Sequence, residues 1–252
     1  MKSAVIYKGP SLIDGKQIVV IVCKLTSSKA ANAKTGDMVQ TYILRDNLDP
    51  LETIRRGEDK SICGDCPHRG AGFKERTCYV NVGQGALSTW RAYKRGSHAT
   101  LTPEDCGKLV RGRMVRLGTY GDPAAVPSKV WKALVAHAEG WTGYTHQWHK
   151  RYAQGLRKLC MASADSARDA MLASAKGWRT FRVAPASAPN VGREALCPAS
   201  KEAGKILQCV ECKACNGANG RKSSIRIAPH GAYASKANLE ALDARIIARA
   251  AA

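Results

Sequence analysis

Several features that would place this chain in a familiar class are missing from it. No apolar run reaches the roughly 18 residues that a membrane-spanning helix needs, so we expect no contact with a membrane. The apolar part of Met1–Ile6 is too short for a secretion signal, and we expect a cytoplasmic protein. The phosphate-binding loop G-x4-G-K-[ST], the nucleophile elbow G-x-S-x-G and the deaminase pattern H-x-E…P-C-x2-C are also absent, which argues against three large enzyme classes.

Acidic residues are scarce. The chain has 20 of them against 40 lysines and arginines, which gives a formal net charge of +20. A charge of this size favours a polyanionic partner, most commonly nucleic acid, although it can also serve only to keep a surface solvated. Trp148, Lys150 and Arg151 combine an aromatic ring with basic side chains, and they are our candidates for contacting DNA or RNA.

Short apolar strands alternate with amphipathic helices along most of the chain. Strands are expected at 4–7, 17–25, 38–44, 114–119, 143–146, 159–162, 178–183 and 224–228, with helices from 49, at 86–94, from 102, and at 128–138, 166–175 and 236–249. This rhythm predicts an α/β protein of parallel strand–helix units, forming a partial or complete (β/α) barrel. No linker or internal repeat is found, so we expect one domain over 1–252, with metal-binding insertions at 61–80 and 197–217.

The ten cysteines indicate metal binding, because the cytosol keeps thiols reduced and disfavours a disulfide framework. The C-terminal group has a C-x2-C-x2-C run preceded by a distant fourth cysteine, and its members are Cys197, Cys209, Cys212 and Cys215. This spacing is typical of a four-thiolate [4Fe–4S] cluster, with a four-cysteine zinc site as the alternative.

A second group contains only three cysteines, Cys63, Cys66 and Cys78. Three thiolates on a [4Fe–4S] cluster leave one iron free for a substrate or cofactor, much as catalytic zinc keeps an open position. The alternative is a closed zinc knuckle in which His68 or a distant residue supplies the fourth ligand. For the remaining cysteines, Cys23, Cys106 and Cys160, packing is the simplest interpretation.

Polar residues follow three of the expected strands. In a parallel barrel such residues lie at the carboxyl ends of the strands, where ligands bind. His146 and Asp122 are therefore the candidate catalytic residues, and His146 suits proton transfer near neutral pH. The candidate cofactor-binding residues are Gly121, Asp122, Tyr144 and Asp165. Ordinary helix capping by Asp122 and Asp165 is the competing explanation.

Read together, several segments resemble an uncharacterised family of bacteriophage-encoded, cysteine-rich proteins. The matching pieces are Asn32–Gly36, Cys63–Pro67 with Cys78–Tyr79, Gly121–Pro123, Tyr144–His146, Cys197–Ala199 with the C-x2-C-x2-C run, and Ile227–Gly231. That family in turn distantly resembles the radical S-adenosylmethionine enzymes. Their usual C-x3-C-x2-C motif is replaced here by C-x2-C-x11-C.

The resemblance implies a (β/α) partial barrel, a three-cysteine [4Fe–4S] cluster with S-adenosylmethionine as its cofactor, and an auxiliary four-cysteine cluster. It also implies a bacterial host cell as the location. We therefore expect an iron–sulfur enzyme that acts on nucleic acid or on a nucleotide-derived substrate. The alternative is a non-catalytic nucleic-acid-binding protein whose zinc or iron–sulfur sites only brace long loops.

Overall fold

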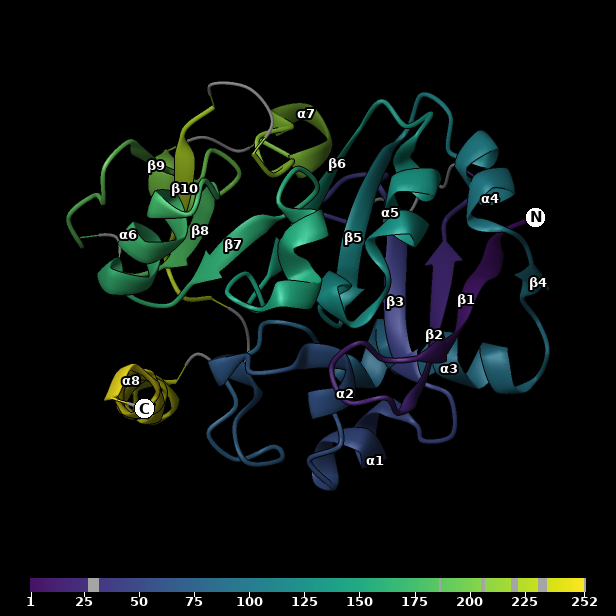
Figure 1. The fold of residues 1–252 in the computed structure, drawn as a ribbon, viewed down its shortest axis with the longest axis horizontal. Helices are drawn as coiled ribbons and strands as arrows, with labels where there is room; N and C mark the ends of the chain where they lie inside the picture. Colours follow the sequence, from purple (N-terminus) through teal and green to yellow (C-terminus); the bar gives the residue numbers. More distant parts are fainter. Residues whose placement is uncertain (27–31, 186, 205–206, 219–221, 231–234, 252) are drawn as a thin grey trace.

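The computed structural model describes residues 1–26, 32–185, 187–204, 207–218, 222–230 and 235–251, so Gly231 of the Ile227–Gly231 segment lies outside the described residues. Its framework is one ten-stranded sheet in the order β4-β1-β2-β3-β5-β6-β7-β8-β10-β9 (Figure 1). The strands are Ser3–Pro10 (β1), Gln17–Cys23 (β2), Val39–Arg45 (β3), Ala99–Thr100 (β4), Met114–Tyr120 (β5), Gly140–Thr145 (β6), Met161–Ala164 (β7), Thr180–Val183 (β8), Glu194–Leu196 (β9) and Ser224–Ile227 (β10).

The sheet is mostly parallel, but its N-terminal part is not. β1 pairs with β2, and β2 with β3, in antiparallel register. The turn at residues 11–16 is too short for a crossover, so β1 and β2 can only form a hairpin. From β3 onward every pairing is parallel. The expected α/β class is confirmed, whereas the sheet is not closed by any pairing of β4 with β9.

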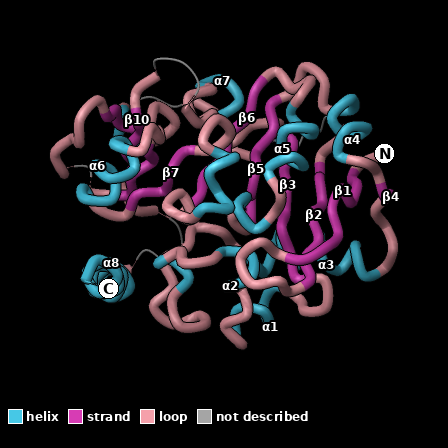
Figure 2. Tube along the Cα trace, in the orientation of Figure 1, coloured by secondary structure: helices cyan, strands magenta, loops and turns pink. Residues whose placement is uncertain are grey.

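The α-helices lie around this sheet (Figures 1 and 2). Their bounds are Pro50–Arg55 (α1), Lys60–Cys63 (α2), Leu87–Lys94 (α3), Pro103–Leu109 (α4), Ser128–Val135 (α5), Ala167–Ala175 (α6), Cys209–Cys212 (α7) and Lys236–Ala251 (α8). Local sequence explains several of their starts, because Asp49, Thr102 and Ser166 each accept a hydrogen bond from a first-turn backbone N–H. Within the described residues no helix is both long and apolar enough to cross a membrane.

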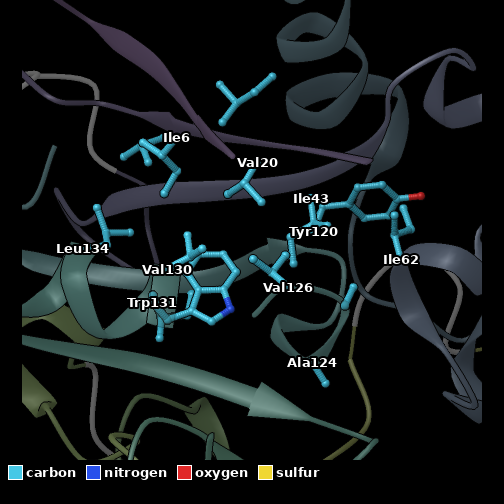
Figure 3. Packing of buried hydrophobic residues seen from close by; sticks show 14 of the residues in the cluster. Ile6, Val20, Ile43, Ile62, Tyr120, Ala124, Val126, Val130, Trp131 and Leu134 are labelled. Carbon is cyan, nitrogen blue, oxygen red and sulfur yellow. The ribbon is translucent and has the colours of Figure 1, made fainter. Parts of the chain in front are cut away.

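The main core lies between the sheet and α5. Val20 and Ile43 on the sheet face Val126, Val130 and Trp131, whose indole is fully buried (Figure 3). Trp131 Nε1 donates to the Pro123 carbonyl at 2.8 Å, so the ring is also fixed in orientation. This packing makes the β3–β5–β6 part of the sheet a rigid platform for the loops at its ends.

A smaller core lies under β7, β8 and β10. Its buried members are Met161, Ile225 and Ile227 together with two cysteines, Cys197 and Cys215. The structure adds strand β9, which was not expected, and starts β7 at Met161 rather than at Leu159. Two cysteines of the C-terminal group are therefore part of the hydrophobic interior.

Candidate metal centres

The three-cysteine loop follows the carboxyl end of β3. Cys63 ends α2, and Cys66 precedes the short 3-10 helix η1, Pro67–Arg69. Two arginines, the buried Arg76 and the partly exposed Arg69, hold this loop on the buried carboxylate of Asp59, with Arg69 at 2.5 Å and Arg76 at 3.5 Å. In Figure 1 the loop lies below the sheet, beside α2. The cysteine backbone is thus fixed by a buried ion-pair network before any ligand binds.

The three thiols lie close enough to influence one another. Burial raises the pKa of Cys63 well above its usual value, and the neighbouring Asp59, Cys66 and Cys78 raise it further. Burial also raises the pKa of Cys78. Next to them, the buried Tyr120 hydroxyl has no hydrogen-bond partner among the described residues. An unpartnered donor beside buried thiols is a feature that an anionic metal-bound sulfur would satisfy.

Histidine and aspartate side chains border these thiols. His146, directly after β6, places Nε2 3.7 Å from Cys66 Sγ and 3.3 Å from Asp165 Oδ1. Asp165, directly after β7, is also 3.2 Å from His68 Nε2. The Asp165 side chain is 1 % exposed, and the two histidines are 12 % (His68) and 17 % (His146) exposed. Residues from three separate loops therefore meet at the carboxyl ends of β3, β6 and β7.

Electrostatics couples these groups. Burial by itself lowers the pKa of His146, but Cys66 and Asp165 raise it well above its usual value. Burial raises the pKa of Asp165, yet His146 and His68 lower it strongly overall. These opposite shifts favour a carboxylate at Asp165 and a protonated ring at His146 in the metal-free protein. The pair offers both a proton and a negative charge beside Cys66.

Asp122 and Gly121, two of the expected site residues, have roles in backbone structure. Asp122 accepts hydrogen bonds from the N–H groups of Ala124 at 2.9 Å and His146 at 2.8 Å, so both of its carboxylate oxygens are engaged. Gly121 has φ +88°, and a Cβ there would lie 2.7 Å from the Ile43 Cβ. Asp122 thus positions His146, while Gly121 allows close packing against β3.

The four-cysteine group is built from chain segments far apart in sequence. Backbone hydrogen bonds join Cys197 N to Arg226 O at 2.7 Å, Cys209 N to Lys34 O at 2.8 Å, and Gly143 N to Cys215 O at 3.1 Å. α7, which carries Cys209 and Cys212, lies beside the upper end of β6, far from α2 (Figure 1). Arg179 fixes the following turn through the carbonyls of Ala214 and Gly217.

Cations surround this second group. Burial raises the pKa of Cys197 and Cys209, and that of Cys215 to about 12. Neighbouring thiols of the group raise the pKa of these three cysteines further, while Lys34 lowers that of Cys197 and Cys209, and Arg116 lowers that of Cys209. Arg116 is 7 % exposed, and its side-chain contacts are the Tyr79 hydroxyl and the rings of Tyr79 and Tyr144. Among the described residues no carboxylate contacts this buried guanidinium, so a cluster of thiolates fits as its counter-charge.

Sulfur spacing bears on the kind of metal. Four thiolates on one zinc ion lie about 3.8 Å apart, given Zn–S bonds of about 2.3 Å in a tetrahedron. Among the described residues, only His68, His146 and Asp165 bring three potential ligand atoms within 4.8 Å of one another. The four sulfurs are thus not gathered as tightly as a single ion requires, and a cubane, whose irons occupy alternate corners of a cube, accepts a wider spacing.

The structure assigns Tyr144 to the second group rather than to the first. Cys215 adds to burial in raising the pKa of the Tyr144 hydroxyl, and the Tyr144 ring lies 4.5 Å from that of Phe181. Sequence reasoning placed it beside His146, and it missed Lys34 and Arg116 altogether. For Arg116 the available signal was a basic residue inside the otherwise largely apolar strand β5, whereas Lys34 lies in a turn and gave no such signal.

The three residues expected to contact nucleic acid do not form one exposed platform. Trp148 is 7 % exposed, and its indole N–H donates to Ser163 O at 3.2 Å, so the ring is not available for base stacking. Lys150 forms an ion pair with Asp65 at 3.0 Å, whereas Arg151 is exposed. Cys106 and Cys160 are fully buried, as expected for packing, and Cys23 is partly buried against the core.

Comparisons with protein-family models, with curated proteins and with solved structures give no match to this chain. The resemblance to phage-encoded proteins and to radical S-adenosylmethionine enzymes therefore stays a prediction, and the two cysteine-bearing sites carry the functional argument by themselves.

Proposed function

We propose that this protein is an iron–sulfur enzyme with a reactive three-cysteine centre and a closed four-cysteine centre. The observation that carries the proposal is the contact between Cys66, His146 and Asp165 at the carboxyl ends of different strands. His146 Nε2 lies 3.7 Å from Cys66 Sγ and 3.3 Å from Asp165 Oδ1. A metal site that only stabilises the fold requires its ligands and no neighbouring acid–base groups. An imidazolium–carboxylate pair beside a cysteine ligand adds proton-transfer capacity that a purely structural site does not require.

Strand order supports a partial (β/α) barrel. From β3 to β8, and then β10, neighbouring parallel strands follow one another in chain order. Barrels have this sequential order, whereas doubly wound sheets reverse direction at a switch point. A barrel-like sheet gathers its strand-end loops around one axis. This gathering brings the cysteine loop after β3 to the residues that follow β6 and β7.

Each residue of the first centre has a defined role in this proposal. Cys63, Cys66 and Cys78 hold a [4Fe–4S] cluster, which supplies one electron and an iron without a protein ligand. Tyr120 donates its free hydroxyl proton to a sulfur. His146 holds a proton at Nε2 next to Cys66, and Asp165 keeps it there. Asp122 orients His146 through the backbone. S-adenosylmethionine, which the resemblance to radical enzymes implies, would be the cofactor at this centre, although the cysteine spacing C-x2-C-x11-C departs from the motif of those enzymes.

The second centre is closed in this proposal. Cys197, Cys209, Cys212 and Cys215 provide all four cluster ligands, and Arg116 with Lys34 offsets their charge. Cys197 and Cys215 belong to a hydrophobic core, where bound metal contributes directly to folding. We therefore assign structure and electron transfer, rather than substrate binding, to this centre.

A nucleic-acid-binding protein with metal-braced loops is the second candidate. The net charge of +20 favours it, and a nucleic acid or nucleotide-derived substrate also fits the enzyme. The burial of Trp148 removes the best stacking candidate. Salt-dependent binding to DNA or RNA is expected of both candidates, so it cannot separate them.

The proposal is tested by electron paramagnetic resonance of the anaerobically purified, reduced protein. We expect two overlapping cluster signals, of which Cys66→Ser removes one and Cys212→Ser the other. Adding S-adenosylmethionine should change only the signal that Cys66→Ser removes. Cys106→Ala, a buried cysteine outside both groups, is the matched control. An unchanged spectrum in Cys66→Ser would sink the proposal, and colourless zinc protein would favour the braced binding module.

A further inference from the structure

We propose that His68, His146 and Asp165 bind a divalent cation of their own, of the class that prefers nitrogen and oxygen ligands (Mn²⁺, Fe²⁺ or Zn²⁺). This site lies next to the cysteines but does not use them. It goes beyond the proposed iron–sulfur function, because the three donors can form a ligand set whether or not a cluster is present. The cation takes the place of the proton on His146 Nε2, so the cation-bound form and the proton-holding form are alternative states of the same residues. Two histidines and one carboxylate with open positions are the set used by non-haem iron proteins.

The donor geometry fits a first-row metal. Asp165 Oδ1 lies 3.2 Å from His68 Nε2 and 3.3 Å from His146 Nε2, and all three atoms are within 4.8 Å of one another. Metal–ligand bonds of about 2.1 Å place neighbouring ligands roughly 3.0–3.4 Å apart in octahedral or tetrahedral geometry. The two imidazole rings meet at 63° with their centroids 5.7 Å apart. Both Nε2 atoms thus approach the same carboxylate oxygen.

A second layer of hydrogen bonding supports the same site. The other ring nitrogen of His68, Nδ1, lies 2.8 Å from the Thr77 hydroxyl. When Nδ1–H donates to this oxygen, the lone pair of Nε2 is directed at the metal position. Ligating histidines almost always have such an outer partner, which fixes the tautomer and the ring orientation. Thr77 is itself buried.

An adjoining cavity leaves room for a further ligand. A space of about 100 Å³ has His68 and Asp165 in its wall, and its apolar walls include Pro185, Leu239 and Leu242. α8 covers it, and this helix is attached to the cysteine loop by Arg245, which donates to Pro67 O at 3.1 Å. In Figure 1 α8 lies below β7 and β8. A cation here would keep at least one position facing this partly open space, sufficient for water or a small oxygen ligand.

Cys66 borders the site without belonging to it. Its sulfur is 3.7 Å from His146 Nε2, but it is not within 4.8 Å of all three donors. The cation and the cysteine-bound metal would therefore occupy neighbouring sites, which contact each other through His146 and Cys66. Mn²⁺ distinguishes them, because it selects nitrogen and oxygen ligands and binds thiolates poorly.

The test is Mn²⁺ titration of the full chain, purified anaerobically and treated with a weak chelator, followed by electron paramagnetic resonance. We expect one tightly bound Mn²⁺ per chain. Asp165→Asn and His68→Gln should each weaken binding by more than about 100-fold, and Thr77→Val by about 10- to 100-fold, the usual range for an outer partner. His137→Gln, which alters an exposed histidine elsewhere, should leave binding unchanged.

Iron and sulfide are measured on the same samples. Loss of Mn²⁺ binding in Asp165→Asn with full iron and sulfide supports a separate cation site. Unchanged Mn²⁺ binding in Asp165→Asn and Thr77→Val overturns it, as does complete loss of Mn²⁺ in Cys63→Ser with the fold intact. Wild-type protein that binds Mn²⁺ but contains no iron would contradict the iron–sulfur function and leave this inference standing.

Discussion

The two cysteine groups of this protein differ in what borders them. The first is bordered by Asp165, His68 and His146, by a partly open cavity under α8, and by the arginines Arg69 and Arg76. The second is bordered by Arg116, Lys34 and an apolar core, and its cysteine backbone is tied to distant strands. Cations beside thiolates stabilise charge, whereas a histidine–carboxylate pair can move a proton. In our proposal, therefore, the second group serves structure, and the histidine–carboxylate pair beside the first group serves chemistry.

The largest expected effect is on folding. Cys212→Ser should lower the free energy of unfolding by about 4 kcal/mol or more, because it removes a structural metal ligand from the second centre. Cys66→Ser should cost clearly less, since the loop around it is already held by Asp59, Arg69 and Arg76. Denaturant unfolding of both variants measures these free energies. Equal losses of stability in the two variants would contradict the assignment of a structural role to the second centre alone.

Arg116 offers a narrower test of the second centre. Arg116→Gln removes the buried positive charge beside Cys209 and should cost about 3 kcal/mol, the usual loss when one partner of a buried charge pair is removed. Arg116→Lys keeps the charge and should cost less. Unfolding should be measured with metal and after its removal. If Arg116→Gln lowers the free energy of unfolding equally in the metal-bound and the metal-free protein, the guanidinium does not act through the metal.

The second centre should also respond to pH through its thiols. Burial raises the pKa of Cys215 to about 12, so the thiol is protonated at neutral pH in metal-free protein. Binding metal must release that proton, and apparent affinity should therefore rise with pH, by up to about tenfold per unit for each proton released. Zn²⁺ competition at two pH values with proton-release measurements checks the sign. Affinity that falls as pH rises would contradict it.

The smallest effect concerns Asp122. Asp122→Ala should cost about 1–2 kcal/mol, the usual range for a lost cap, because the carboxylate accepts from the backbone of Ala124 and His146. Its effect on the first centre should follow from displacement of His146. Comparison with Asp165→Asn separates the two carboxylates, since that change breaks the buried pair with His146 and should cost more stability, about 3 kcal/mol. Equal losses of stability in Asp122→Ala and Asp165→Asn would contradict these roles.

Local features of the fold were predictable from the sequence. The helix starts at Asp49, Thr102 and Ser166 were found because a capping side chain acts on its own first turn. The parallel arrangement after β3 also followed from the alternation of strands and helices. The antiparallel β1–β2 pair was missed because parallel pairing was assumed for the whole chain, although the turn between these two strands is too short for a crossover connection.

The candidate site was only partly predictable. His146 and Asp165 were found because both follow strand ends, where parallel strands gather polar residues. Tyr144 and His146, two residues apart, were expected to share a site. β6 ends at Thr145, so His146 leaves the strand while Tyr144 remains on it beside Cys215. The meeting of His68 with Asp165 depends on tertiary packing, which sequence spacing does not encode.

Iron and acid-labile sulfide per chain of the anaerobically purified protein test the central claim most directly. Two [4Fe–4S] centres predict about eight irons and about eight sulfides, falling to about four of each in Cys66→Ser and in Cys212→Ser. Protein with about two zinc ions and no sulfide would contradict the account.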